Sequence, residues 1–327
     1  MNYKVSVIVP IYKVEKFIEH YVRSLMEQTL DRVEYIFVND ASTDKSIIIL
    51  KNVITEYVNR NSQITILEHE INKGLPAARN TGLQVATGKY VFHCDSDDFI
   101  ELDMLEKLYR KAVETDADIV WCDWYLSFEK NERYMKQPDY DIPMEALKGI
   151  LSGAMKYNVW NKLVKRSLYV ENQISFPEGY GMGEDMTMIR LFACAQKVAY
   201  LPEAFYHYVK LNGEAFTNTF SERHLMDIKY NVDKTTAYVC NKVGSRIHPY
   251  IDFFKLNAKY PFIISDKREM YQLWRCWYPE ANDSIGTNPH SSLRSKVLQY
   301  AAMYKQYWVL WLHYKLVYKF VYVILYK

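Results

Sequence analysis

Cysteine is scarce and scattered in this chain of 327 residues. The five cysteines are odd in number, lie far apart and never form a CxxC pair. This argues against a disulfide framework and against a zinc site, and it favours a reducing compartment. The N-terminus also lacks the basic, apolar and small-residue succession of a secretory signal, because a strand-like run begins at Val5. We therefore expect a cytoplasmic protein.

A strong net charge is absent as well. The 41 basic and 39 acidic side chains leave a formal net charge of +2, which argues against a nucleic-acid-binding surface. The glycine-rich phosphate-binding motifs GxGxxG and GxxxxGKS/T follow none of the predicted strands. Phosphate groups would therefore need another counter-charge on this protein.

The first half of the chain contains a regular alternation of strand and helix. Short apolar runs predict buried strands at residues 5–9, 34–38, 64–68, 90–94 and 118–124. Helices are predicted at 14–27, from Ser42 or Thr43 as N-cap to about 59, at 76–87 and at 102–115. The short loops between them indicate right-handed βαβ units, hence an α/β fold with a mostly parallel, Rossmann-like sheet flanked by helices.

Three carboxylates follow the fourth strand, in the stretch Asp95-Ser96-Asp97-Asp98. The carboxyl edge of an open α/β sheet is where such sheets bind ligands. Like charges this close need a cation, a hydrogen-bonded ligand or a shifted pKa. A divalent metal held by Asp97 would supply the missing counter-charge for phosphates. The alternative is a solvated acidic turn in which Asp97 or Asp98 caps the next helix.

The second half is less regular. Residues 130–143 are polar and contain two prolines, which predicts a loop, and residues 147–164 show no clear pattern. Three glycines at 179–183 precede Glu184 and Asp185, which begin a predicted helix at 186–195. The positive end of a helix dipole would by itself explain two acids there. Short strands are predicted at 198–201 and 205–209, and the chain is helical from about 221.

Five motifs in this order resemble those of the family-2 glycosyltransferases. They are the opening strand Val5–Tyr12, the stretch Val38–Asp44, the segment Gly74–Gly82, the acidic cluster Asp95–Asp98 and Gly183-Glu184-Asp185. Each is weak alone, but together they are specific, and they extend over residues 3 to about 210. The departures are small: Asn39 stands where Asp is commoner, and Ala41 where Gly is commoner.

The resemblance implies a GT-A fold, a nucleotide-diphospho-sugar donor, Mn²⁺ or Mg²⁺, and inversion at the anomeric carbon. It places Pro10, Tyr12 and Asp40 in the base pocket, which suits uracil best, and Arg79 near the diphosphate. The remaining roles are Asp95 and Ser96 for the nucleotide, Asp97 for the metal, and Asp185, with Glu184 second, as the general base. Asn80 and Gly82 are expected to pack the helix, and Asp98 to support the site or cap a helix.

Three further residues are candidates. Trp160 and Lys162 lie where the family has a segment near the acceptor. The alternative for Trp160, which the usual burial of tryptophan favours, is a buried residue that holds the two halves of the fold together. His207 lies in a short predicted strand, from which it could reach the metal or a phosphate. The alternative for His207 is a hydrogen-bonded core histidine.

The C-terminal stretch 284–327 contains no Asp or Glu but has six basic residues and many aromatic ones. Basic residues interleaved with Tyr and Trp are typical of helices at anionic membrane surfaces. We expect the tail, about 291–327, to attach the protein peripherally to the inner face of the plasma membrane. The apolar run is interrupted by His313, Lys315 and Lys319, so a membrane span is not expected. The alternatives are a helix packed on the catalytic domain or on a partner in a homodimer.

The predicted organisation is a catalytic domain at 1–215, with a nucleotide-binding half at 1–124 and an acceptor-side half at 125–215, followed by a helical region at 216–327. The expected activity is sugar transfer to a glycan or lipid-linked acceptor in cell-surface polysaccharide synthesis. A sugar-phosphate nucleotidyltransferase is a second hypothesis, although Pro10–Lys13 lacks the glycine- and arginine-rich loop of those enzymes. A non-catalytic nucleotide-binding partner of a membrane complex is a third.

Overall fold

The computed structural model describes residues 3–210 and 221–317, and it divides into two compact units. Unit 1 comprises Met1–Ala146 and Tyr157–Thr235, and unit 2 comprises Leu147–Lys156 and Thr236–Lys327. The predicted boundary at residue 215 falls among residues 211–220, which lie outside the described residues. The division between the two units lies within helix α8 (Glu222–Val243), and the segment Leu147–Lys156 belongs to the second unit.

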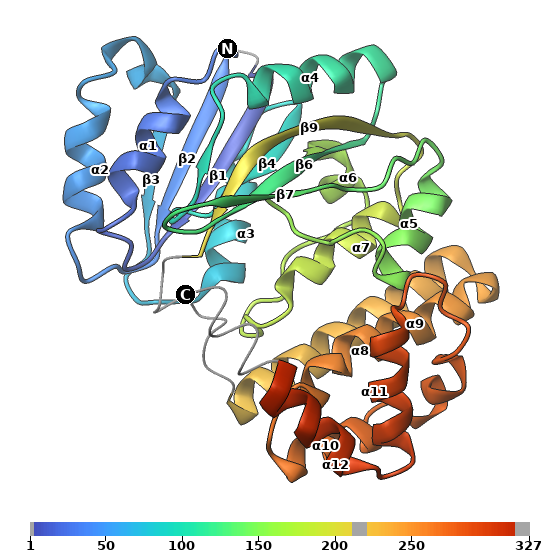
Figure 1. Cartoon of the computed structure of the whole chain (residues 1–327). Coiled ribbons are helices and arrows are strands. Elements are labelled where there is room, and N and C mark those ends of the chain that lie inside the picture. The colour runs from blue at the N-terminus through green and yellow to red at the C-terminus, as the bar shows by residue number, and fades with distance from the viewer. Residues whose placement is uncertain (1–2, 211–220, 318–327) are drawn as a thin grey trace. The chain divides into compact units, whose positions relative to one another are not determined.

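Unit 1 is built on one sheet, whose described strands run in the order β3-β2-β1-β4-β8-β6-β9-β5, with β7 paired to β6 (Figure 1). The strands are β1 (Val5–Ile11), β2 (Val33–Asn39), β3 (Ile64–Glu68), β4 (Tyr90–His93), β5 (Phe99–Ile100), β6 (Ile119–Ser127), β7 (Glu132–Met135), β8 (Lys162–Lys165) and β9 (Val198–Val209). Strands β3, β2, β1 and β4 are parallel, as the βαβ pattern predicted.

Strand β8 is the main departure from that pattern. It runs antiparallel between β4 and β6, so these two strands are not neighbours. The predicted loop at 130–143 contains β7, and the two strands predicted at 198–209 form the single strand β9, whose pairing with β6 is irregular near Asp123. β7 and β8 are thus recognisable by their partners rather than by their own sequences.

The helices of unit 1 flank this sheet (Figure 1). Those wholly within it are α1 (Ile18–Met26), α2 (Ser46–Ile54), η1 (Val58–Gln63), α3 (Leu75–Val85), α4 (Met104–Thr115), α6 (Arg166–Glu171), η2 (Glu184–Met186) and α7 (Thr187–Phe192). Helices α5 (Pro143–Ser152) and α8 continue from unit 1 into unit 2. Unit 2 adds η4 (Ser245–Ile247), α9 (His248–Lys259), η5 (Tyr260–Ile263), α10 (Arg268–Cys276), η6 (Pro279–Ser284), α11 (Leu293–Met303) and α12 (Tyr307–His313).

Helix α3 packs directly on the centre of the sheet. A Cβ atom on Gly82 would lie 2.4 Å from Cγ2 of Ile8 in β1, so only glycine permits this approach. Gly82 is therefore a packing residue, as expected. Because α3 carries Arg79 on its buried side, this close packing also determines where the Arg79 side chain enters the site.

Helix α2 begins later than predicted, at Ser46. Ser42 does not cap it, because the Ser42 hydroxyl accepts from the backbone N–H of Lys13 at 2.8 Å. The Asp44 carboxylate accepts from the backbone N–H groups of Ser46 and Glu15. These bonds join the loop after β2 to the loop after β1, so side chains expected to start a helix hold the edge of the sheet instead.

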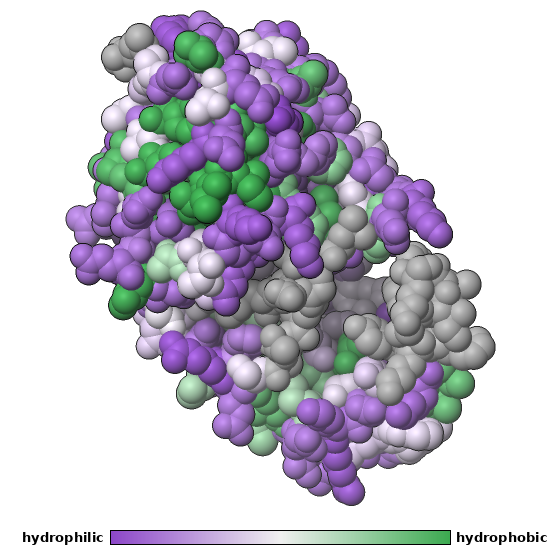
Figure 2. Space-filling view, turned by 90° about the vertical axis from the view of Figure 1, so that its left-hand side faces the viewer, coloured by the Kyte–Doolittle hydropathy of each residue, from purple (hydrophilic) through white to green (hydrophobic). Residues whose placement is uncertain are grey.

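Apolar side chains gather over the side of unit 1 that carries α2 (Figure 2). The helix contains the run Ile47-Ile48-Ile49-Leu50, and Leu50 is buried whereas Ile48 is exposed. Four consecutive aliphatic residues cannot all point inward on one helix, so part of the run faces solvent. In the described parts of the chain, no helix is long and apolar enough to span a membrane.

Candidate active site

The site begins where the parallel strands end. β1, β2 and β4 end at the same edge of the sheet, and Tyr12, Asp40 and Asp95 follow their last residues closely. The Tyr12 ring is 42% exposed, whereas Pro10 is buried within β1. Tyr12 is thus accessible at the edge where ligands bind, and the Lys13 ammonium lies 5.2 Å from the centre of its ring.

Asp40 holds the loop that leads into α3. Its carboxylate contacts Nδ1 of His69 at 2.6 Å and accepts from the backbone N–H groups of Lys73 and Gly74, each at 2.8 Å. Nε2 of His69 contacts the Thr81 hydroxyl at 2.9 Å. His69 was not among the predicted site residues. The signal in the sequence was its place directly after the predicted strand 64–68, and the register Asn39↔Glu68 between β2 and β3 then puts His69 beside Asp40.

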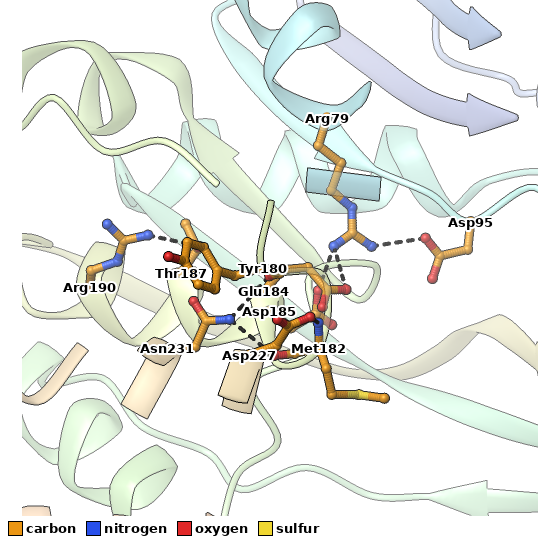
Figure 3. Close-up of polar contacts among 10 residues, drawn as sticks. All are labelled: Arg79, Asp95, Tyr180, Met182, Glu184, Asp185, Thr187, Arg190, Asp227 and Asn231. Atoms are coloured by element: carbon orange, nitrogen blue, oxygen red, sulfur yellow. Dashed lines mark hydrogen bonds and ion pairs between the residues drawn. The ribbon is translucent and has the colours of Figure 1, made fainter. Parts of the chain in front are cut away.

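Arg79 joins the two acidic motifs (Figure 3). One guanidinium nitrogen donates to Asp185 at 2.6 Å and to Glu184 at 3.3 Å, and the other donates to Asp95 at 3.0 Å. The side chain is only 1% exposed, and its guanidinium lies 5.4 Å from the centre of the Phe176 ring. The expected position of Arg79 was near a diphosphate. The structure shows it as the link between the end of β4 and the turn η2.

The charges around Arg79 do not balance, because three carboxylates share one guanidinium. Burial and the neighbouring Asp185 raise the pKa of Glu184 to about 8. Burial also raises the pKa of Asp185, although the Arg79 guanidinium opposes this rise. Two carboxyl groups in such an environment titrate together. A carboxyl group with a raised pKa is suited to accept a proton near neutral pH.

The cluster 95–98 separates into residues with different environments. Asp98 is buried, where it accepts from the Tyr206 hydroxyl at 2.6 Å and from the backbone N–H of Val209 at 2.8 Å. The Tyr206 hydroxyl also accepts from the backbone N–H of Asp95 at 3.2 Å. Asp98 thus supports the site from within, as expected. Ser96 is also buried, whereas Asp95 and Asp97 are partly open to solvent.

The donors offered by Asp95 and Asp97 suit a divalent metal. Carboxylate oxygens are hard ligands of the kind that Mg²⁺ and Mn²⁺ prefer. Within residues 3–210 and 221–317, however, no three His, Cys, Asp or Glu side chains converge on a point that could hold an ion. Mg²⁺ is commonly bound by one or two carboxylates together with substrate phosphates and water, and Asp97 fits that arrangement.

Trp160 and Lys162 are buried next to this region. The Trp160 ring stacks on Tyr206 at 4.4 Å and on Tyr208 at 5.3 Å between ring centres. The ammonium of Lys162 donates to the Asn158 carbonyl and to the Asn161 side chain, each at 2.8 Å, and burial lowers its pKa to about 7. Trp160 therefore has the packing environment that was named as the alternative to an acceptor contact.

His207 lies within the sheet and is buried. Its Nδ1 contacts Glu132 at 2.7 Å and its Nε2 contacts Glu101 at 2.9 Å. The ring is stacked on Phe99 and on Tyr125, with centres 4.1 Å and 4.8 Å away. Because both ring nitrogens already have carboxylate partners, we do not assign His207 to the metal. It has the environment of the hydrogen-bonded core histidine.

The fold belongs to the class of nucleotide-binding α/β folds. Its ligand-binding edge carries an exposed tyrosine and acidic residues after the strands, and an arginine on helix α3. The chain is a member of glycosyl transferase family 2, whose pattern matches residues 6–181, more than half of the chain. It is 33% identical over 212 residues to EpsH of Bacillus subtilis (strain 168), which is named as a glycosyltransferase. The alignment covers 62% of this chain and 60% of EpsH, so the chain spans less than two thirds of that relative.

Two solved structures resemble the fold. Residues 1–349 of S. aureus TarS, in complex with UDP-GlcNAc, match 95% of this chain and 91% of that one, with a TM-score of 0.69 and 22% identity. The mannosyltransferase PcManGT of Pyrobaculum calidifontis, in complex with GDP-Man and Mn²⁺, matches 96% of this chain and 85% of that one, with a TM-score of 0.54 and 18% identity. The predicted GT-A fold is thereby confirmed.

Proposed function

We propose that the protein transfers a sugar from a nucleotide-diphospho-sugar, with UDP as the nucleotide, to a glycan or lipid-linked acceptor in cell-surface polysaccharide synthesis. The observation that carries the proposal is the ion-pair cluster in which Arg79 connects Asp95 to Glu184 and Asp185. It brings the predicted nucleotide side and the predicted base to one point at the ligand-binding edge of the sheet. The complex of TarS with UDP-GlcNAc supports UDP as the nucleotide.

The residues then take distinct roles. Tyr12 stacks on the base in the pocket that Asp40 shapes, and Asp95 binds the ribose. Asp185 removes the proton from the acceptor hydroxyl as this attacks the anomeric carbon, which inverts its configuration. A bound Mn²⁺ or Mg²⁺ would supply charge neutralisation at the departing diphosphate, and Asp97 would hold it.

Arg79 has a further part in this scheme. Its guanidinium is held by the carboxylates of Asp95, Glu184 and Asp185. A diphosphate offers the same kind of partner with more charge, so an arriving donor competes for Arg79. Arg79 would then exchange its bond to Asp185 for one to the donor, and Asp185 would be free to act as the base.

The test is a panel of UDP- and GDP-sugars, screened with and without Mn²⁺ for thermal stabilisation and for nucleotide release. We expect UDP-sugars to stabilise the protein only with the metal, and Asp97→Ala to abolish this effect. Asp185→Asn should keep donor binding but lose transfer, whereas Asp116→Asn at an exposed site should change neither. Full transfer by Asp97→Ala and Asp185→Asn would refute the assignment, and pyrophosphate release from UTP would favour a nucleotidyltransferase.

We further propose that unit 2 attaches the protein to an anionic membrane surface. Trp308 and Trp311 of α12 are 65% and 49% exposed, and no acidic residue lies in the sequence between Ser284 and the C-terminus. Aromatic side chains among basic ones bind the interface of anionic bilayers. Residues 318–327, the end of the predicted tail, lie outside the described residues.

Vesicle sedimentation tests this attachment. We expect binding to phosphatidylglycerol vesicles but not to phosphatidylcholine vesicles, with loss of binding in the Trp308→Ser, Trp311→Ser double variant. The matched control is the Ile48→Ser, Val58→Ser double variant, which removes two exposed aliphatic residues of unit 1 instead. Unchanged binding by the tryptophan variant would contradict the proposal. A doubled mass in light scattering that the tryptophan variant loses would assign the surface to a homodimer.

A further inference from the structure

The two acidic residues of η2 are reached through a short loop with little regular structure of its own. This approach loop, residues 179–183, begins and ends with glycines in the left-handed region, Gly179 at φ +81° and Gly183 at φ +86°. Glu184 follows Gly183 directly. The direction in which the Glu184 and Asp185 carboxylates point therefore depends on what holds the approach loop in place.

Helix α8 supplies that hold (Figure 3). The side-chain amide of Asn231 donates to the backbone carbonyl of Tyr180 at 3.2 Å and to that of Met182 at 3.0 Å. The Asp227 carboxylate accepts from the backbone N–H of Met182 at 3.4 Å. Asn231 and Asp227 are only 3% and 5% exposed, so water cannot easily replace either contact.

Two further α8 side chains contact the same loop. Arg223 donates to the carbonyl of Gly179 at 3.2 Å, and the Tyr230 ring stacks on Tyr180 with centres 3.6 Å apart and planes 7° from parallel. Residues 223, 227 and 231 are spaced four apart and residue 230 follows 227 by three, so all four lie on one face of the helix. This face belongs to the part of α8 within unit 1, which extends to Thr235.

We propose that this face of α8 positions the catalytic carboxylate, with Asn231 as the central positioning residue and Asp227 as its support. The inference rests on the proposed function, in which Asp185 is the base. Asn231 donates to two backbone carbonyls that lie two residues apart, those of Tyr180 and Met182. It therefore fixes both the position and the backbone conformation of the loop just before Gly183. A displacement of about 1 Å at a reacting group reduces turnover about a hundredfold, so a support of this kind affects the rate directly.

The residues involved lie outside the family pattern, which ends at residue 181. The family pattern therefore assigns them no role, although they contact the loop that leads to Glu184 and Asp185. A merely structural role would change the stability of the protein but not the turnover of its folded fraction. The two roles are separable by measuring turnover and loop mobility on the same variants.

The experiment compares Asn231→Asp with Asn241→Asp. Aspartate keeps the shape of asparagine but has no N–H donor, and its charge would face two carbonyl oxygens. Asn241 is an exposed residue of the same helix, so its variant is a matched control. We expect Asn231→Asp to lower kcat for UDP release from UDP-GlcNAc at least about tenfold, with the Kd for UDP nearly unchanged. Hydrogen exchange of the peptide 179–186 should become faster in this variant alone.

Asp227→Asn keeps an oxygen that can accept from Met182, so hydrogen exchange of the peptide 179–186 should change less in this variant than in Asn231→Asp. Equal kcat and equal exchange at 179–186 in the Asn231 and Asn241 variants would overturn the inference. If the wild-type protein releases UDP from none of the UDP-sugars in the panel, or if Asp185→Asn retains full turnover, the proposed function is at fault. The hydrogen-exchange comparison then still decides whether α8 holds the approach loop.

Discussion

Replacing Arg79 with methionine would test whether the acidic motifs depend on one buried cation. Methionine keeps much of the length and apolar stem of arginine but removes the guanidinium. The change leaves three carboxylates, Asp95, Glu184 and Asp185, without the partner that contacts all of them. Their side chains are 25%, 13% and 21% exposed, so water can solvate them only in part.

The expected cost follows from this burial. Removing one partner of a buried ion pair typically costs about 3–5 kcal/mol, because the remaining charge stays buried. Partial exposure of the carboxylates places this case near the lower end, at about 3 kcal/mol near pH 8. In the variant, the pKa values of Glu184 and Asp185 rise further, because the guanidinium that opposed their rise is gone, so the folded state binds more protons than the unfolded state. Stability is therefore recovered as the pH falls, and the loss should be clearly smaller near pH 5.5.

Urea unfolding of wild type and variant at both pH values measures the effect. Arg23→Met is the matched control, because Arg23 also bridges two carboxylates, Glu19 and Glu56, but on the surface of the protein. Solvent screens that cluster, so its loss should cost much less. The reasoning would be refuted if Arg79→Met cost no more than Arg23→Met, or if its cost were the same at both pH values.

Three further predictions concern single groups. Ala41 has φ +55°, where an L-residue is strained, so Ala41→Gly should raise the free energy of unfolding by about 0.5–1 kcal/mol in urea titrations; a lower value would contradict the strain. Because burial raises the pKa values of Glu184 and Asp185, kcat should increase with pH across neutrality as the base loses its proton, and a flat profile would exclude them. Tyr206→Phe leaves the buried Asp98 without its hydroxyl donor, which should cost about 1–3 kcal/mol and weaken metal-dependent UDP binding; unchanged thermal and binding curves would argue against this support.

Much of the fold was predictable because it depends on local patterns. The apolar runs that became β1 to β4 were placed close to their observed bounds, and a helix was predicted correctly between each pair of them. β7 and β8 were missed, because short antiparallel strands with polar neighbours resemble loops in sequence. α2 was predicted to begin too early, because the Ser42 hydroxyl bonds to a neighbouring loop instead of capping the helix.

The candidate site was predicted only as a set of residues. The acidic cluster after β4 was expected at the carboxyl edge of the sheet, whereas Pro10, Tyr12 and Asp40 were named from the family resemblance. The residues that these side chains contact were not predicted. His207 was named as a possible metal ligand, but its ring nitrogens contact Glu101 and Glu132. A residue type states what chemistry is possible, but burial and neighbours decide which of its interactions forms.

The sequence by itself determined the class of fold, the family and the order of the acidic motifs, since periodicity and motif order are properties of short segments. Only the tertiary structure decided that Arg79 contacts Asp95 and Asp185, and that Asn231 contacts the loop before Glu184 and Asp185. The physical reason is that these contacts join residues far apart in the chain. Their geometry is set by how closely α3 packs on the sheet and which face α8 turns to the loop, and no local pattern encodes either.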